Sequence, residues 1–333
     1  MLNKLCARGL YWSFFMVMMI YKISRFLAKL FCVGLIFLLA FRGYGLYHYT
    51  YVLQENTDFK TSVKTPVLTR FSEGDMRLNH QLSSQLNAYV INLDRSTDRW
   101  NTIKPKLDMM HIPYYRLSAV DGKAIPNETL RMSADDNKSK ELFGRLLKGA
   151  EIGCYLSHYF AIQDFMASSS SYALILEDDL DFSPQELTRV IQDLLHVKDK
   201  WDIANLYTTG GVRKHKTVTT LPRDERSLVY FTTRTHMAVA YLLNRKAGQA
   251  LLQKSLPVVL PYDWVIIREW DLGIKYRGVL PIVGKHHDLN YSNISSDKRP
   301  LSAESGYSRY TSQMFEYANR KAHYYNNFLR ALW

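Results

Sequence analysis

The sequence predicts an α/β domain with a largely parallel central sheet, preceded by an apolar segment near the N-terminus. Short apolar runs typical of buried strands alternate with stretches of helical periodicity, as in strand–helix–strand units. One such run, Ala173–Leu176, leads directly into three carboxylates, Glu177, Asp178 and Asp179 (the acidic triplet). Charge at the end of a buried strand lies where open α/β sheets bind ligands.

Strand and helix signals follow one another along most of the chain. Apolar or alternating runs predict strands at Ala88–Leu93, Tyr114–Ala119, Ala173–Leu176, Asp202–Tyr207 and His236–Leu243. Helical patterns predict a helix after Arg99 that is interrupted at Pro105, and further helices at Ile152–Phe165, Ser183–Val197 and Arg245–Gln253. Lysine and asparagine residues predict an exposed loop at Ser133–Lys140.

The net charge and the cysteine content limit which binding partners and cellular compartments are expected. The 333-residue chain carries a net charge of +12, but no block of Lys and Arg is dense enough to indicate a nucleic-acid-binding arm. The positive charge fits anionic lipid headgroups, phosphates or acidic glycans, and a solvated basic surface explains it almost as well. The three cysteines, Cys6, Cys32 and Cys154, show neither a disulfide framework nor zinc-ligand spacing, which favours a reducing compartment.

The N-terminus predicts a membrane anchor within residues 1–45. Two apolar runs, Leu10–Tyr21 and Leu30–Phe41, are each too short for the roughly 20 residues that span a bilayer. The segment Phe26–Phe41, with Lys29 reaching toward the interface, is the candidate for a single anchor. A later translation start and a cleaved signal peptide remain alternatives. Basic residues before the span predict that the domain lies outside the cytosol.

Three adjacent carboxylates repel one another and are tolerated more easily when a cation lies among them. Mg²⁺ and Mn²⁺ prefer oxygen ligands and keep positions open for phosphates of a substrate. From these residues alone, a metal site and an ordinary acidic turn both remain open.

Four short sequence blocks, taken in their order along the chain, carry a resemblance to a known family. They are Tyr89–Arg99, Ser118–Gly122, Gly149–His158 and Leu174–Leu180, with a weaker fifth block at Leu260–Asp263. With these blocks the chain resembles glycosyltransferase family 25, which includes bacterial lipooligosaccharide galactosyltransferases and collagen galactosyltransferases. The resemblance covers about residues 87–295.

The resemblance implies a GT-A-type nucleotide-sugar-binding fold and an inverting transfer of galactose or glucose from a UDP-sugar to a glycan or glycoconjugate. Lipopolysaccharide or other glycan biosynthesis is the corresponding process. Glu177 and Asp179 then occupy the outer positions of an Asp-x-Asp-like motif that binds Mn²⁺ or Mg²⁺. His286 is a candidate third metal ligand, and the alternative for it is a surface pair with His287.

Further candidates follow from the blocks. The donor-binding set comprises Asn92, Asp94, Arg95, Arg99, Asp121, Glu151, Ser157, His158 and Asp178. For these residues the alternatives are helix capping, surface ion pairs and, for His158, a structural role in the core. Asp263 is the candidate base for the acceptor hydroxyl, and a helix cap is the alternative for it. Asp179 is the second candidate catalytic residue, through the metal ion that it would bind. Ser157 and His158 do not indicate a hydrolase, because no G-x-S-x-G motif accompanies them.

The predicted organisation is an anchor at 1–45, a stem at 46–86, a transferase domain at 87–300 and an aromatic, basic helical tail at 301–333. Membrane sidedness stays open between a bacterial inner membrane and a Golgi or ER membrane. Two rival functions remain: a nucleotidyltransferase, which would share the acidic strand end, and a non-catalytic membrane-linked module that binds nucleotide sugars or glycans.

Overall fold

The computed structural model describes residues 19, 23–36, 59–71, 82, 84–208, 214–223 and 225–286. The chain divides into two units, Met1–Val52 and Leu53–Trp333. In the first unit, residues 23–36 form a helix with exposed side chains. Among the described residues, no helix combines the length and the apolar character required to cross a bilayer. Most of the predicted anchor, much of the stem and the whole tail at 301–333 lie outside the described residues.

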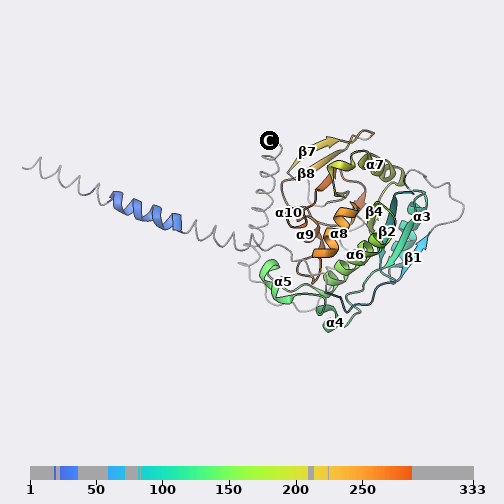
Figure 1. Cartoon of the computed structure of the whole chain (residues 1–333), viewed down its shortest axis with the longest axis horizontal. Helices are drawn as coiled ribbons and strands as arrows, with labels where there is room; N and C mark the ends of the chain where they lie inside the picture. The colour runs from blue at the N-terminus through green and yellow to red at the C-terminus, as the bar shows by residue number, and fades with distance from the viewer. Residues whose placement is uncertain are drawn as a thin grey trace, which may run out of the picture. The chain divides into compact units, whose positions relative to one another are not determined.

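A mixed sheet forms the centre of the second unit (Figure 1). Its nine described strands run in the order β1-β3-β2-β4-β9-β6-β10-β8-β7. They are β1 (Leu68–Phe71), β2 (Leu86–Asn92), β3 (Tyr114–Ser118), β4 (Tyr172–Glu177), β6 (Ile203–Asn205), β7 (His215–Thr220), β8 (Ser227–Phe231), β9 (Ala240–Asn244) and β10 (Tyr276–Leu280). A small second sheet pairs β5 (Leu180–Asp181) with β11 (Lys285–His286). The segment predicted as a stem thus contributes β1 to the main sheet.

The prediction of a mostly parallel sheet is wrong. Only three neighbouring pairs are parallel: β2 with β3, β2 with β4, and β6 with β10. The other five pairs are antiparallel, because β9 inserts between β4 and β6 and the β7–β8 hairpin closes one edge. The central strands are buried on both faces and therefore read as continuous apolar runs, whichever direction they take.

Helices cover both faces of the sheet. They are α3 (Thr97–Asp108), α4 (Asn127–Arg131), α5 (Asp136–Phe143), α6 (Gly149–Ala167), α7 (Pro184–His196), the 3₁₀ turn η1 (Lys198–Lys200), α8 (Arg245–Lys254), α9 (Tyr262–Ile266) and α10 (Glu269–Leu272). The predicted helix after Ser183 is confirmed, and the Ser183 hydroxyl accepts a hydrogen bond from the Glu186 amide.

Two local predictions are wrong. The helix α3 continues through Pro105, where the missing amide costs one backbone hydrogen bond but the remaining turns stay intact. The expected loop at Ser133–Lys140 contains the start of α5, which Asp135 caps by accepting a hydrogen bond from the Lys138 amide at 2.9 Å. Polar composition indicates exposure, and an exposed, well-capped helix satisfies it as well as a loop does.

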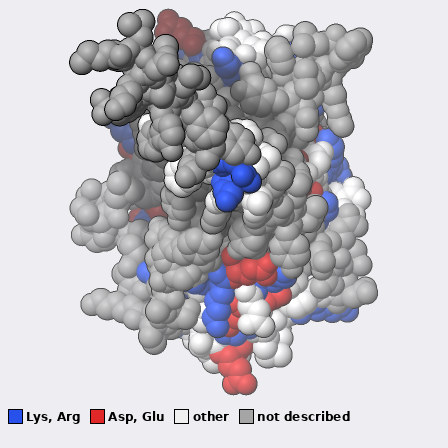
Figure 2. All heavy atoms as spheres, turned by 90° about the vertical axis from the view of Figure 1, so that its left-hand side faces the viewer, with Lys and Arg blue, Asp and Glu red and all other residues white. Residues whose placement is uncertain are grey.

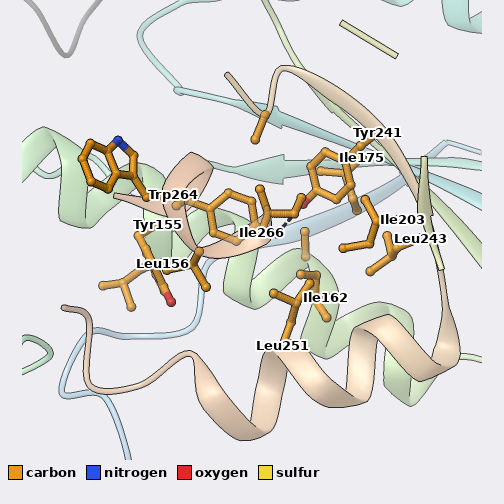
Figure 3. Close-up of a cluster of buried hydrophobic side chains, with 14 of the residues drawn as sticks. Tyr155, Leu156, Ile162, Ile175, Ile203, Tyr241, Leu243, Leu251, Trp264 and Ile266 are labelled. Atoms are coloured by element: carbon orange, nitrogen blue, oxygen red, sulfur yellow. Dashed lines mark hydrogen bonds between the residues drawn. The ribbon is translucent and has the colours of Figure 1, made fainter. Parts of the chain in front are cut away.

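Alternating side chains of the strands face two separate cores. Tyr89, Ile175 and Tyr241 lie on the face covered by α6, α8 and α9, whereas Val90 and Leu174 lie on the face covered by α3 and α7. Figure 3 shows the first of these clusters, in which side chains of α6 and α8 meet those of β4, β6 and β9. Burial on both faces fixes the strand register and therefore the position of every strand end.

Charged side chains pair with one another on the described surface. Arg131 lies 2.7 Å from Asp136, and Lys138 lies 3.1 Å from Glu141. Figure 2 shows acidic and basic groups side by side on the described part of one face. Exposed pairs of this kind stabilise a fold by only about 0–1 kcal/mol each, so they influence the surface potential more than stability.

Glycines allow the loop after β3 to lie directly against the start of α6. A Cβ atom on Gly122 would overlap the carbonyl oxygen of Gly149, and one on Gly153 would lie 2.5 Å from the Val120 oxygen. A residue larger than glycine therefore fits at neither position unless the backbone shifts. This contact brings the Ser118–Gly122 and Gly149–His158 blocks together.

Gly122→Ala is expected to lower the free energy of unfolding by about 3 kcal/mol, because the added methyl group collides with backbone rather than with a movable side chain. Gly248→Ala is the matched control, since its Cβ meets the flexible Met166 side chain and the change favours the helix. Urea denaturation of both variants tests this, and equal stability losses would contradict the expected backbone collision.

Candidate active site

A pocket lies at the edge of the sheet where β2, β3 and β4 end. We call it the edge pocket. Its walls are Ile91, Leu93, Arg95, Arg99, Ala119, Val120, Asp121, Gly122, Lys123, Ala150, Cys154, Ser157, Glu177, Asp178 and Asp179. The strands β3, β2 and β4 are parallel neighbours, so their carboxyl ends meet at this edge. From α6, Ala150, Cys154 and Ser157 face the pocket at helical spacing.

The acidic triplet turns away from β4 into a polar cluster. Asn92 Nδ2 donates to Asp178 Oδ2 at 2.6 Å, and an Arg99 guanidinium nitrogen lies 3.1 Å from Asp178 Oδ1. The same nitrogen lies 3.5 Å from Asp179 Oδ2. Arg99 therefore neutralises two neighbouring carboxylates that are both largely buried.

Burial raises the pKa of Asp178 to about 6, and the nearby Asp179 carboxylate adds to this effect. The hydrogen bond from Asn92 and the charge of Arg99 lower the pKa but do not offset the loss of solvation. The carboxyl group at the centre of the triplet therefore takes up a proton more readily than an exposed aspartate does.

Stability is expected to depend on pH through Asp178. Between the ordinary pKa of 3.8 and the folded value of about 6, the folded protein binds a proton that the unfolded chain releases, so stability falls as pH rises. Relative to wild type, metal-free Asp178→Asn should gain up to about 3 kcal/mol of unfolding free energy between about pH 4 and about pH 7. Urea denaturation with chelator measures this gain, and a constant difference between the proteins would contradict it.

Glu177 is held by a buried chain of aromatic residues. His158 is fully buried, with Nε2 3.1 Å from Glu177 Oε1 and Nδ1 3.1 Å from the Tyr241 hydroxyl. The Tyr241 hydroxyl lies 2.7 Å from that of Tyr262, whose ring stacks on His158 with centroids 4.2 Å apart. These contacts fix the imidazole plane and thereby the orientation of the Glu177 carboxylate.

The residues after β2 form a second polar group. Arg116 donates to Asn92 Oδ1 at 2.8 Å and to Asp94 Oδ1 at 2.7 Å. Hydrogen bonds from Ser118 and Arg116 lower the pKa of Asp94. Asp94 is not part of the pocket wall, but the ion pair of Arg95 with Asp121 is.

Three further candidates have structural contacts of their own. Glu151 binds Arg145 through both carboxylate oxygens at 2.7 and 2.8 Å and caps α6, and it does not line the edge pocket. Ser157 lines the pocket while its hydroxyl donates to the Gly153 carbonyl and accepts from the Val120 amide. The backbone of His286 pairs with Leu180, the residue that follows the acidic triplet.

Asp263 lies in the first turn of α9, where Oδ2 accepts from the Met237 amide at 3.3 Å. It is outside the pocket wall. Burial raises the pKa of Cys154, and the charges of Glu177 and Asp263 add to this effect.

Sequence reasoning missed several residues of this site. Cys154 and Lys123 line the pocket, and Arg116, Tyr241 and Tyr262 support residues that do. The spacing of Ala150, Cys154 and Ser157 on one face of a helix could have indicated Cys154. Tyr262 lies in the fifth block, Leu260–Asp263, but no local signal indicates Tyr241, because its contact with His158 joins distant parts of the chain.

The carboxylates of the edge pocket fit a divalent cation. Glu177 and Asp179 supply carboxylate oxygens to the pocket, the ligand type that Mn²⁺ and Mg²⁺ prefer. Both carboxylate oxygens of Asp178 are bound, by Asn92 and Arg99. The contacts of Glu177 with His158 and of Asp179 with Arg99 each involve one oxygen, so the outer two members of the triplet are the better candidates to hold the ion.

Comparison with known proteins identifies the family to which the chain belongs. A family model described as glycosyltransferase family 25 (LPS biosynthesis protein) matches residues 85–266. A glycosyltransferase 25 family member from Aedes aegypti is 34% identical over 190 residues, covering 53% of this chain and 29% of that protein. Procollagen galactosyltransferase 1 from Danio rerio is 28% identical over 182 residues, covering 53% and 30% of the two chains.

The human inactive glycosyltransferase 25 family member 3 is 29% identical over 184 residues, again covering 53% of this chain and 30% of the relative. The match thus spans under a third of the length of these relatives, and one of the three carries the word inactive in its name. Because the family model covers more than half of the sequence, the chain belongs to glycosyltransferase family 25.

Proposed function

We propose that this chain is a metal-dependent, inverting glycosyltransferase of GT-A type that moves galactose or glucose from a UDP-sugar to a hydroxyl of a glycan or glycoconjugate. One observation carries the proposal: the acidic triplet shares the edge pocket with Arg95, Arg99 and Lys123. Carboxylates suited to a dication and cations suited to phosphate oxygens lie together, as a diphosphate leaving group requires.

In this proposal each part of the pocket has a role. Glu177 and Asp179 would hold Mn²⁺ or Mg²⁺, which when bound neutralises charge on the diphosphate as the sugar–oxygen bond breaks. Asp178 stays bound to Asn92 and Arg99 and keeps the triplet in place. Arg95 and Lys123, also on the pocket wall, are positioned to meet donor phosphates.

An inverting transfer also needs a base for the acceptor hydroxyl. We assign this role to Asp263, because it is only partly buried and follows Tyr262, whose ring stacks on His158 beside the pocket. The hydrogen bond from the Met237 amide would hold the carboxylate in one orientation while it accepts the proton.

The apolar N-terminal unit would hold the enzyme at a membrane as a single-pass anchor. Support comes from the sequence, in which basic residues precede the apolar stretch Phe26–Phe41. A bacterial inner membrane and a Golgi or ER membrane are both consistent with this arrangement.

A non-catalytic, donor-binding module is the second candidate. The observation that favours it is the match to relatives that carry the word inactive in their names. Donor binding without turnover would identify this case.

The test measures UDP release by the full chain across a panel of UDP-sugars, with Mn²⁺ and with chelator. We expect turnover with UDP-galactose or UDP-glucose that stops when the metal is removed. Pyrophosphate release instead of UDP would indicate the nucleotidyltransferase. If no turnover is seen, metal-dependent binding of a UDP-sugar would support the binding module, and absence of any binding would exclude a nucleotide-sugar function.

A further inference from the structure

Three side chains of the kinds that bind transition metals converge beside the edge pocket. Cys154 and His158 lie four residues apart on one face of α6, and Glu177 ends β4. A ligand atom from each lies within 4.8 Å of the other two, and His158 Nε2 is 3.1 Å from Glu177 Oε1. A tetrahedral zinc site places its ligands about 3.5 Å apart, so closing this set takes side-chain movements on the order of 1 Å.

The surroundings of His158 match those of a metal-binding histidine. Such residues donate their second ring N–H to a neighbouring acceptor, which fixes the tautomer and the ring orientation. Here Nδ1 is 3.1 Å from the Tyr241 hydroxyl, and the Tyr241 hydroxyl is 2.7 Å from that of Tyr262. The Tyr262 ring lies parallel to the imidazole, with 3° between the planes, and holds its orientation.

We propose that Cys154, His158 and Glu177 bind a zinc-type transition-metal ion, with its fourth position open to the edge pocket. Thiolate and imidazole ligands select zinc over the hard ions that suit the carboxylates of the acidic triplet. Because Cys154 and Glu177 line the pocket, an ion can enter from solvent.

Binding forms one bond to each of the three ligands and breaks the hydrogen bond between His158 and Glu177. The thiol proton of Cys154 passes to water. In the bound site His158 carries its proton on Nδ1, which donates a hydrogen bond to the Tyr241 hydroxyl. This site shares Glu177 with the Mn²⁺ or Mg²⁺ site of the proposed function, but cobalt binding tests it without any measurement of sugar transfer.

Cobalt(II) is the probe, because a thiolate ligand gives it a sulfur-to-cobalt charge-transfer absorption. The full chain is used with Cys6→Ser and Cys32→Ser, which leave Cys154 as its only cysteine. We expect the band to saturate at one equivalent, to disappear when Zn²⁺ is added and to persist in excess Mg²⁺.

Two variants assign the ligands. Cys154→Ser should abolish the band, and Tyr241→Phe should keep it while weakening cobalt affinity about tenfold, since it removes the acceptor for Nδ1–H. Absence of the band in the parent, or full affinity in His158→Asn, would overturn the proposal. If Cys154→Ser fails to fold, the parent band and the tenfold shift in Tyr241→Phe still decide the question.

Discussion

Asp179→Ala is expected to abolish metal-stimulated sugar transfer while the domain stays folded. Asp179 lines the edge pocket as an outer member of the acidic triplet, and its loss would remove one of two carboxylates assigned to the cation. A cation at a phosphoryl oxygen contributes several kcal/mol of charge stabilisation, so turnover should fall by about 10³-fold or more. UDP release at saturating Mn²⁺ measures the loss.

Folding should not account for this loss. Asp179 repels the buried Asp178 carboxylate, so its removal relieves like-charge repulsion in the metal-free protein, and the melting temperature should hold or rise. Asp181→Ala is the matched control, because Asp181 follows the triplet closely but lies in β5, pairs with Lys106 and is outside the pocket wall. Equal turnover losses in both variants would argue against a special role for Asp179.

Much of the fold could be predicted because its signals are local. The strand ending at Glu177 is marked by its apolar run, and the helix after Ser183 by its capping residues. Strand direction could not be predicted, because β9 is buried on both faces and carries no mark of being antiparallel. Direction depends on the path of the chain between strands, which apolar periodicity does not record.

The same distinction applies to the site. Arg99 and the acidic triplet lie in blocks that could be read from the sequence, and the structure brings these residues together in one pocket. Tyr241 could not be identified, because it is an ordinary core residue until the fold places it against His158, and the fifth block marked Tyr262 without showing this contact. The blocks contained Gly122 and Gly153, but they did not show that the loop after β3 lies against α6, since close backbone approach leaves no periodic pattern.

Arg99→Ala is expected to cost about 3–5 kcal/mol of unfolding free energy in the metal-free protein. Arg99 lies 3.1 Å from one carboxylate oxygen of Asp178 and 3.5 Å from one of Asp179, and the side chains of both aspartates are about 10% exposed. Removing the shared guanidinium leaves two buried carboxylates facing each other without their counter-charge, which is the costly way to break a buried ion pair. Urea denaturation with chelator measures the loss.

Arg95→Ala provides the comparison that isolates burial. Arg95 also lines the edge pocket and pairs with an aspartate, Asp121, but its side chain is 44% exposed. Water solvates both partners after the change, so the expected loss is about 0–1 kcal/mol. Mn²⁺ should restore part of the stability of Arg99→Ala and little of that of Arg95→Ala, because only the first change leaves the acidic triplet without a neighbouring cation. Similar losses in the two variants, with no response to Mn²⁺, would mean that Arg99 is not the counter-charge of the triplet.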